Sequence, residues 1–329
     1  MVKNVWNLRP VDHDTLKKAK HALLCMQRHS WEHGVTMQAF LEAGDMDTVI
    51  LLAKEAAYRM SEDGRPALID YYHAVTDPVS VGEALLSAWH TTEDSALEKC
   101  LEKMKKWVME DAPRNAEGIL YHLDDSRQFW ADSMYMLPPA MASLGYPGEG
   151  HAQMEGYWKA LYDDADGLVH HIWDEDQQKY TRTAYWGVGN GWALAGIARL
   201  IDLLPDEMAA EKRDWVNKEK KLLLSVLKFR CEEGFHDILD AEESFIEINL
   251  AQMVSYTIYR GIRSGWLPRG EWLKTAEELR MLSEKNLDRY GIIRNACGAP
   301  DFNKPGTAPE AQAFYILMET AAGSICDEP

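Results

Sequence analysis

Apolar positions recur along the chain mostly with helical spacing, and strand-like alternation is sparse. One helical face is formed by Leu97, Leu101, Met104 and Val108, with charged residues elsewhere in the same segment. The same spacing links Ile197, Leu200, Ile201 and Leu204, and Pro205 then ends the pattern. The chain is therefore predicted to be mainly helical.

A longer pattern repeats six times: a polar or aromatic loop is followed by a helix rich in small and apolar residues. Markers for these loops are Trp31, Asp77, Asp132, Gly189, Glu247 and Thr307, separated by 46, 55, 57, 58 and 60 residues. A charged, amphipathic helix, such as residues 96–109 or 206–228, lies between markers. This period predicts one αα-hairpin per repeat.

Six such hairpins favour an all-α fold, an (α/α)6 barrel, in a single domain over residues 1–329. The small-residue helices would form an inner ring, and the amphipathic helices an outer ring with one solvated face. The alternative is an open helical solenoid, but the terminal repeats lack the polar cap that an open stack needs. In the barrel, the inner helices would point their N-termini at one mouth, a favourable place for an anionic ligand.

Composition narrows the classes of function. The formal net charge is −18 and there is no basic stripe, so nucleic acid is not expected as a partner. Five scattered cysteines, at positions 25, 100, 231, 297 and 326, indicate reduced thiols and a reducing compartment. No apolar leader or membrane-spanning run is present, so we expect a cytoplasmic protein with no membrane partner.

The segment FWADSMYMLPP at residues 129–139 places Asp132 among aromatic and sulfur-containing side chains. A carboxyl in apolar surroundings is costly to ionise, so its pKa is expected to rise, as a proton donor near neutral pH requires. The alternative is that Asp132 caps a helix beginning at Ser133, because Asp is a favoured N-cap residue.

This segment resembles the surroundings of the catalytic Asp in the unsaturated uronyl hydrolases of glycoside hydrolase family 105, which are related to the unsaturated glucuronyl hydrolases of family 88. Other segments agree in the same order between about residues 22 and 318. They are Pro113-Arg114 with Tyr121-His122, Asp77 with Gly82, GLVHHIWD at 167–174, WGVGNGW at 186–192 and GTAPE at 306–310.

The resemblance implies an (α/α)6 barrel without a metal or cofactor. It also implies a substrate, an oligosaccharide left by a polysaccharide lyase with a C4=C5 unsaturated uronic acid at its non-reducing end. Asp132 would protonate C4 and help water to add at C5. Asp77 is the candidate second carboxylate, holding a sugar hydroxyl and keeping Asp132 protonated by like-charge repulsion. As an alternative, Asp77 is a turn residue before Pro78.

Further residues are candidates for substrate binding. His171 would bond the uronate or a hydroxyl, although a structural histidine is an equal alternative. The candidate aromatic walls are Trp186 and Trp192, with Trp31 and Trp130 as weaker candidates; tryptophans at helical spacing also fill cores. Asn190, between two glycines, would lie in a loop that allows close backbone approach to the ligand, or in a plain turn. His122 and Arg114 are expected to act as structural supports.

One position departs from the family pattern, which usually has Arg where this chain has Val188. An Arg there would be a natural partner for the uronate. Its absence leaves the recognition of the carboxylate open, with Arg182, Arg294 and Lys179 as candidate substitutes. The linkage, the second sugar and the oligomeric state are not predicted.

Two other functions fit the same fold. A sugar epimerase would use paired histidines, but His170 and His171 are adjacent, so their side chains should diverge. A non-catalytic carbohydrate-binding barrel has Val188 as its only support. The segment HSWEH at residues 29–33 fits a zinc-protease pattern, H-x-x-E-H. It lies at a repeat junction before Gly34, so no metal site is predicted.

Overall fold

A computed structural model describes residues 7–68 and 72–325. Its inner helices are α2 (Ser30–Glu42), η1 (Asp77–Val81) continued by α4 (Gly82–Thr92), α6 (Ser133–Met136) with α7 (Pro138–Ser143), α9 (Gly187–Leu203), α11 (Asn249–Arg263) and α13 (Pro309–Ser324). Each inner helix packs against the next in chain order, and α13 packs against α2. The ring is therefore closed, which confirms the (α/α)6 barrel and rules out the open solenoid.

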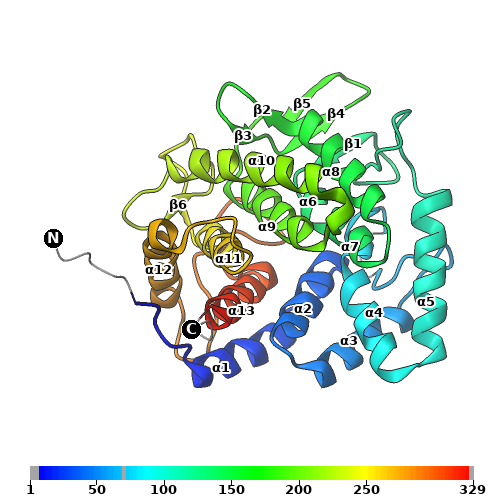
Figure 1. Cartoon of the computed structure of the whole chain (residues 1–329), viewed down its shortest axis with the longest axis horizontal. Helices are drawn as coiled ribbons and strands as arrows, with labels where there is room; N and C mark the ends of the chain where they lie inside the picture. The colour runs from blue at the N-terminus through cyan, green and yellow to red at the C-terminus, as the bar shows by residue number, and fades with distance from the viewer. Residues whose placement is uncertain (1–6, 69–71, 326–329) are drawn as a thin grey trace.

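The outer helices lie around this ring. They are α1 (His13–Leu24), α3 (Met46–Tyr58), α5 (Ser95–Lys106) with the π-helical turn η2 (Trp107–Asp111), α8 (Pro147–Leu161), the 3₁₀ turn η3 (Asp206–Met208) with α10 (Ala209–Leu227), and α12 (Arg269–Lys285). Figure 1 shows α1, α5, α10 and α12 at the periphery, around α2, α9, α11 and α13. The two predicted amphipathic segments correspond to α5 and to η3 with α10.

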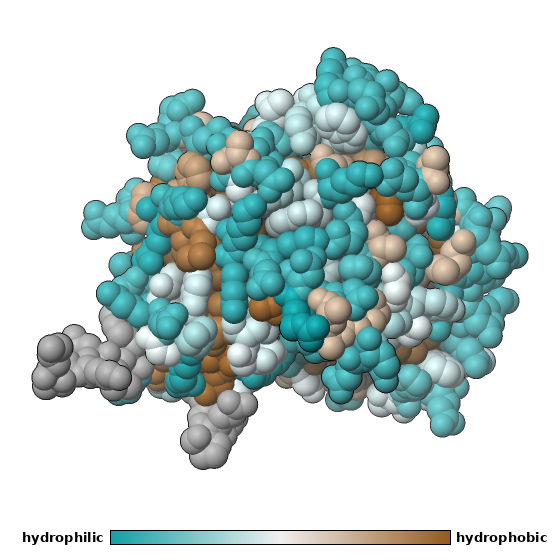
Figure 2. Space-filling view, turned by 45° about the horizontal axis from the view of Figure 1, so that its top comes forward, coloured by the Kyte–Doolittle hydropathy of each residue, from teal (hydrophilic) through white to brown (hydrophobic). Residues whose placement is uncertain are grey.

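Burial explains why the two sets of helices differ in sequence. Every residue of α9 from Gly187 to Ile201 is buried, so this part of the helix has no solvent-exposed face that would favour polar residues. In α5, burial is restricted to the predicted face, with Leu97, Cys100, Leu101 and Met104. Figure 2 shows hydrophilic residues over most of one face of the molecule, with hydrophobic residues mainly in recesses between them.

Short strands connect some of the hairpins. A three-stranded antiparallel sheet has the order β1 (Gln128–Trp130), β4 (Ile172–Asp174), β5 (Lys179–Arg182). Two-stranded sheets pair β2 (Tyr162–Asp163) with β3 (Leu168–Val169), and β6 (Phe235–His236) with β7 (Ile246–Glu247). In the larger sheet Trp130, the last residue of β1, lies opposite Ile172, the first residue of β4, so the residues that follow β1 lie beside His171, which precedes β4.

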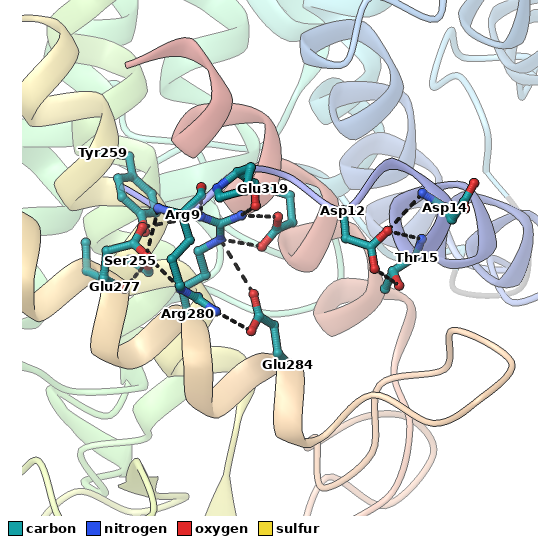
Figure 3. Close-up of polar contacts among 12 residues, drawn as sticks. Arg9, Asp12, Asp14, Thr15, Ser255, Tyr259, Glu277, Arg280, Glu284 and Glu319 are labelled. Carbon is teal, nitrogen blue, oxygen red and sulfur yellow. Dashed lines mark hydrogen bonds and ion pairs between the residues drawn. The ribbon is translucent and has the colours of Figure 1, made fainter. Parts of the chain in front are cut away.

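The N-terminal segment is attached to the last two hairpins by a cluster of charged side chains (Figure 3). Arg9 forms ion pairs with Glu277 at 2.9 Å and with Glu284 at 2.6 Å, both on α12. Arg280 on α12 forms a two-point ion pair with Glu319 on α13, with N···O distances of 2.7 and 2.6 Å. This cluster, the Arg280 cluster, joins the beginning of the described chain to its end.

In the part of the chain that the structure describes, no helix is both long and apolar enough to cross a membrane. Cys25, Cys100, Cys231 and Cys297 are free thiols. Cys326 lies outside the described residues.

Candidate active site

A cavity of about 250 Å³ lies where the N-terminal ends of the inner helices meet. Its lining residues are Trp31, Asp77, His122, Trp130, Asp132, Met136, Trp186, Val188, Trp192, Cys297, Phe302 and Glu310. Most of them come from the beginnings of inner helices or from the loops before them. The repeat that predicts the fold therefore also positions the site, because the loops at five of the six markers, all except Glu247, contribute lining residues.

Asp77 and Asp132, the two predicted carboxylates, both line this cavity. Asp77 is the first residue of η1, and Asp132 directly precedes α6. The side chain of Asp132 makes no capping hydrogen bond to α6. Capping therefore does not account for this residue, and its carboxylate is available to the cavity.

His171 lies against Asp132, outside the residues that line the cavity. Its Nε2 is 3.3 Å from Asp132 Oδ2. Burial acts to raise the pKa of Asp132, but the neighbouring imidazoles of His171 and His122 outweigh it and lower that pKa. The expectation that Asp132 has a raised pKa is therefore wrong, because a histidine distant in sequence lies beside its carboxyl group.

The raised pKa belongs to Asp77 instead. Burial and the nearby charges of Asp132 and Glu310 raise the pKa of Asp77 well above its ordinary value. His122 Nε2 lies 3.9 Å from Asp77 Oδ1. Burial lowers the pKa of His122 to about 4, so its ring is neutral near pH 7. The pKa values of the two carboxyl groups are thus shifted in opposite directions, upward at Asp77 and downward at Asp132, the pattern expected of an acid–base pair.

His122 is more than the structural support predicted from the sequence, since it lines the cavity and stacks on Trp130 with ring centroids 4.4 Å apart. Its Nδ1 lies 2.9 Å from both Thr76 Oγ1 and Ser133 Oγ, which fixes the ring. Arg114 does act as a support: its guanidinium donates to the carbonyl groups of Val108 and Ala112.

Four tryptophans form the predicted aromatic walls, Trp31, Trp130, Trp186 and Trp192. Trp192 is also a core residue, only 2% exposed and packed between Tyr135 and Phe314. Val188 lines the cavity, as expected for the position where the family usually has Arg.

The structure gives Asn190 a different place from the predicted one. Residues 187–203 are helical, so Asn190 lies inside α9 and not in a loop. Its amide is fully used by the backbone, accepting from Val169 N–H and donating to the carbonyl groups of Val169 and Trp186. Gly191 allows close helix packing, because a Cβ there would lie 2.2 Å from Met253 Sδ on α11. Asn190 therefore holds β3 on α9 and does not reach the cavity.

Of the three cations considered as substitutes for the absent Arg, only Arg182 is near the site. Its Nη1 lies 2.7 Å from His171 Nδ1, and its guanidinium lies over the Trp186 ring. Lys179 and Arg294 are exposed. Arg182 is not among the residues that line the cavity, so it is linked to the site through His171 and Trp186.

Neither the His170–His171 pair nor the H-x-x-E-H segment brings its side chains together into one site. His170 bonds the carbonyl of Thr183 and lies 3.3 Å from Asp163, whereas His171 faces Asp132, so no epimerase-like histidine pair forms. In the H-x-x-E-H segment, Glu32 accepts from the backbone N–H groups of Arg28 and His29.

His33, the second histidine of the H-x-x-E-H segment, is also held by the fold, since its Nε2 bonds the carbonyl of Leu52 at 2.9 Å. The helix begins inside the motif, at Ser30, with His29 as its N-cap. The side chains of Glu32 and His33 are therefore engaged in building the first hairpin.

Sequence reasoning missed Glu310, Met136, Cys297 and Phe302 as cavity residues. Glu310 accepts a hydrogen bond from Trp31 Nε1 at 2.8 Å, while its buried Oε2 has no hydrogen-bond partner among the described residues. Burial and the charge of Glu32 raise the pKa of Glu310 to about 8. Its position in the GTAPE segment was a usable signal, but the loop bearing Cys297 and Phe302 carries none.

Comparison with known proteins assigns the family. The model of Glycosyl Hydrolase Family 88 matches residues 7–320. The chain is 28% identical over 240 residues to the unsaturated rhamnogalacturonyl hydrolase YesR of Bacillus subtilis, covering 67% of each protein. It is 23% identical over 217 residues to an unsaturated 3S-rhamnoglycuronyl hydrolase of Formosa agariphila, covering 60% of this chain but only 56% of that relative.

Solved structures share the fold. A possible member of glycoside hydrolase family 105 from Salmonella enterica superimposes with a TM-score of 0.80 at 20% identity, covering 94% of this chain and 92% of the other. The unsaturated glucuronyl hydrolase of Bacillus sp. GL1 gives a TM-score of 0.69 at 13% identity, covering 94% of each. The predicted resemblance to families 105 and 88 is thus confirmed, and the chain belongs to glycosyl hydrolase family 88.

Proposed function

We propose that this protein removes a 4,5-unsaturated uronic acid from the non-reducing end of lyase-generated oligosaccharides by hydrating the C4=C5 double bond. The observation that carries the proposal is the pair Asp77 and Asp132, with opposite pKa shifts, in one aromatic-lined cavity. The names of the relatives support it, since they are unsaturated rhamnogalacturonyl and rhamnoglycuronyl hydrolases. A cavity of about 250 Å³ would hold the terminal sugar, with the remaining sugars extending from the mouth.

In the proposed reaction a carboxylic acid gives its proton to C4 and water adds at C5. The carboxylate that remains takes a proton from this water, so the acid form is regenerated. The resulting hemiketal opens and releases the remaining sugar. This hydration needs one well-placed acid–base group and a positioned water, unlike glycosidases in which two carboxylates flank the anomeric carbon.

We assign the acid–base role to Asp132. The pKa of Asp77 is raised and that of Asp132 is lowered, so a proton held by the pair would reside on Asp77 before substrate binds. An anionic uronate bound beside Asp132 would raise the pKa of this carboxyl through like-charge repulsion, so the proton becomes available to Asp132 when substrate is present. Asp77 would then bind a sugar hydroxyl.

The other cavity residues are assigned to substrate binding. Trp186 and Trp192 would contact the faces of the sugar ring, with Trp31 and Trp130 completing the wall. His171 would assist through its contact with Asp132. Intact carboxyls at both positions favour catalysis over a purely carbohydrate-binding barrel.

We also propose that the chain forms a single domain over residues 1–329 and works in the cytoplasm. The contact of α13 with α2 supports the single domain, and the four free thiols support a reducing compartment. The net charge of −18 argues against nucleic acid as a partner.

The substitution Asp132→Asn tests the assignment, with the initial rate followed as loss of the double-bond absorbance of an unsaturated disaccharide. Asn cannot supply the proton, so turnover should fall roughly 10²–10⁴-fold or more. Because Asp132 makes no capping bond to α6, the variant should remain folded, as should Asp132→Ala. A well-folded Asn variant with wild-type turnover would remove Asp132 from the mechanism.

A further inference from the structure

Arg182 lies behind His171, on the side away from Asp132. It is half-buried on β5, donates from Nη1 to His171 Nδ1 at 2.7 Å, and places its guanidinium 5.4 Å from the centre of the Trp186 ring. It is not a lining residue of the cavity. Any effect of Arg182 on the chemistry must therefore pass through the side chains that it contacts, which are His171 and the cavity residue Trp186.

The contact fixes where the proton of His171 lies. A guanidinium has only N–H donors and stays charged, so the ring atom that faces it must accept with a lone pair. His171 Nδ1 is therefore unprotonated, and the proton of the neutral ring is on Nε2. That atom lies 3.3 Å from Asp132 Oδ2, and neither atom has a hydrogen-bond partner within the described residues.

We propose that Arg182 is a positioning residue that holds His171 in its Nε2–H tautomer and so aims an N–H donor at Asp132 Oδ2. The separation of 3.3 Å is long for a hydrogen bond, and such contacts commonly shorten when the substrate binds. The catalytic part of this inference rests on the proposed function. The tautomer itself does not, because it follows from the contact of Arg182 with the ring.

Among the described residues, the other neighbours of the His171 ring hold its position but do not hydrogen-bond to Nδ1, so Arg182 is the residue that sets the tautomer. Trp186 packs on His171 with centroids 4.6 Å apart, and Trp130 meets it edge-on at 5.6 Å, so the ring is held in place. The other charged or titratable groups that act on Asp132 or His171 are His122, Asp77, Glu310 and Asp237. Among the hydrogen bonds of the described residues, Nδ1 has only the bond from Arg182.

Two substitutions separate the donor from other effects. Arg182→Met removes both the donor and the charge, so Nδ1 becomes free to take a proton. Arg182→Lys keeps a charged donor that has no acceptor and should preserve the tautomer. Lys179→Met is the matched control, since it removes a cation from an exposed position of the same strand.

The direct measurement is the long-range ¹H–¹⁵N spectrum of the protein labelled at histidine, with the His171 signals assigned from a His171→Gln variant. Wild type, Arg182→Lys and Lys179→Met should show a proton on Nε2 and none on Nδ1. Arg182→Met should show protonation at Nδ1. A wild-type ring protonated at Nδ1, or an Arg182→Met spectrum identical to wild type, would overturn the proposal.

Kinetics on an unsaturated disaccharide supply the second readout. Arg182→Met should lose roughly 10–100-fold in kcat, less than the loss expected for removal of the acid–base group itself, with little change in KM. The acid limb of its pH profile should shift, and Arg182→Lys should restore both. An unchanged kcat and profile in a folded Arg182→Met protein would overturn the catalytic part. Wild-type protein inactive on every unsaturated substrate would instead defeat the proposed function, while the spectrum would still decide the tautomer.

Discussion

At the scale of single residues, the site departs from expectation where chain segments distant in sequence meet. Asp132 was expected to have a raised pKa because its sequence neighbours are apolar. In the structure its buried position is offset by His171, which lies 39 positions further along and 3.3 Å away. Local sequence gives the polarity of a side chain's neighbours along the chain, but the pKa depends on the groups that tertiary contact brings near.

Val188 offers a residue-scale test of substrate recognition. It lines the cavity with 3% of its surface exposed, so Val188→Arg would place a guanidinium beside the substrate. We expect this variant to change the ranking of unsaturated disaccharides by kcat/KM more than it changes melting temperature, because guanidinium pairs well with carboxylate.

Val188→Met controls for the added volume without charge, and should lower all rates without changing their order. The measurement is kcat/KM across a panel of unsaturated glucuronyl and galacturonyl disaccharides. A ranking that is the same in wild type, Val188→Met and Val188→Arg would contradict a position beside the sugar.

At the scale of elements, the sequence predicts the placement of a helix best where its residue pattern has a single physical cause. The six small-residue segments became the inner helices because a helix surrounded by others must be small and apolar on every side. The amphipathic segments became outer helices for the complementary reason. The markers also predicted the mouth of the site, since Asp77, Asp132 and Glu310 all lie at the beginnings of inner helices.

The site residues that sequence reasoning misplaced or missed lie where element boundaries are hard to predict or in irregular loops. The glycines around Asn190 suggested a loop, but Gly191 permits α9 to pack closely on α11, a requirement set by another helix. Phe302 enters the cavity from a segment with no periodic pattern. Such contacts exist only in the assembled barrel, so they cannot be predicted from one segment of the sequence.

Glu219 gives a test at the scale of one helix. It lies fully buried on α10, and neither carboxyl oxygen has a hydrogen-bond partner in the described chain. Burial raises its pKa well above the ordinary value, so the folded state binds a proton that the unfolded state releases as the pH rises. Glu219 therefore lowers stability increasingly above its unfolded pKa of about 4.5.

Glu219→Met should increase the free energy of unfolding by about 1–3 kcal/mol, because an unpaired buried polar group is removed. The gain should be larger at pH 8 than at pH 5, as measured by urea unfolding. Glu211→Met, in the first turn of the same helix, removes an acidic residue favourable to the helix dipole and should slightly destabilise. A gain that grew as the pH fell would contradict the raised pKa.

At the scale of the whole molecule, the two ends of the barrel have different roles. The cavity lies at the N-terminal ends of the inner helices, whereas ion pairs link their C-terminal parts. Arg260 on α11 pairs with Asp202 on α9 at 2.6 Å and with Glu42 at the end of α2 at 2.9 Å. Cations near helix C-termini are favoured by the helix dipole, so charge placement helps to close this end of the ring.

The Arg280 cluster has the same function for the chain as a whole, because it joins the N-terminal segment, α12 and α13. Arg280 also donates to the carbonyl of Arg9 at 2.9 Å. Both Glu277 and Glu319 are almost fully buried, with 1% and 2% of their side chains exposed. Buried carboxylates that lose their partner are strongly destabilising, whereas exposed pairs contribute little.

Arg280→Met should therefore lower the free energy of unfolding by about 3–5 kcal/mol, since it leaves Glu319 charged, buried and without its two-point partner. Amide hydrogen exchange should rise first in α12 and α13, the two helices that the cluster joins to the N-terminal segment, and least in α5. Lys159→Met breaks an exposed pair with Glu117, 72% and 62% exposed, and should cost no more than about 1 kcal/mol. The double variant Arg280→Met with Glu319→Leu should recover part of the loss, because no unpaired charge then remains at that position. If Arg280→Met were as stable as Lys159→Met, or if exchange rose uniformly around the ring, the cluster would not be what joins the first hairpin to the last.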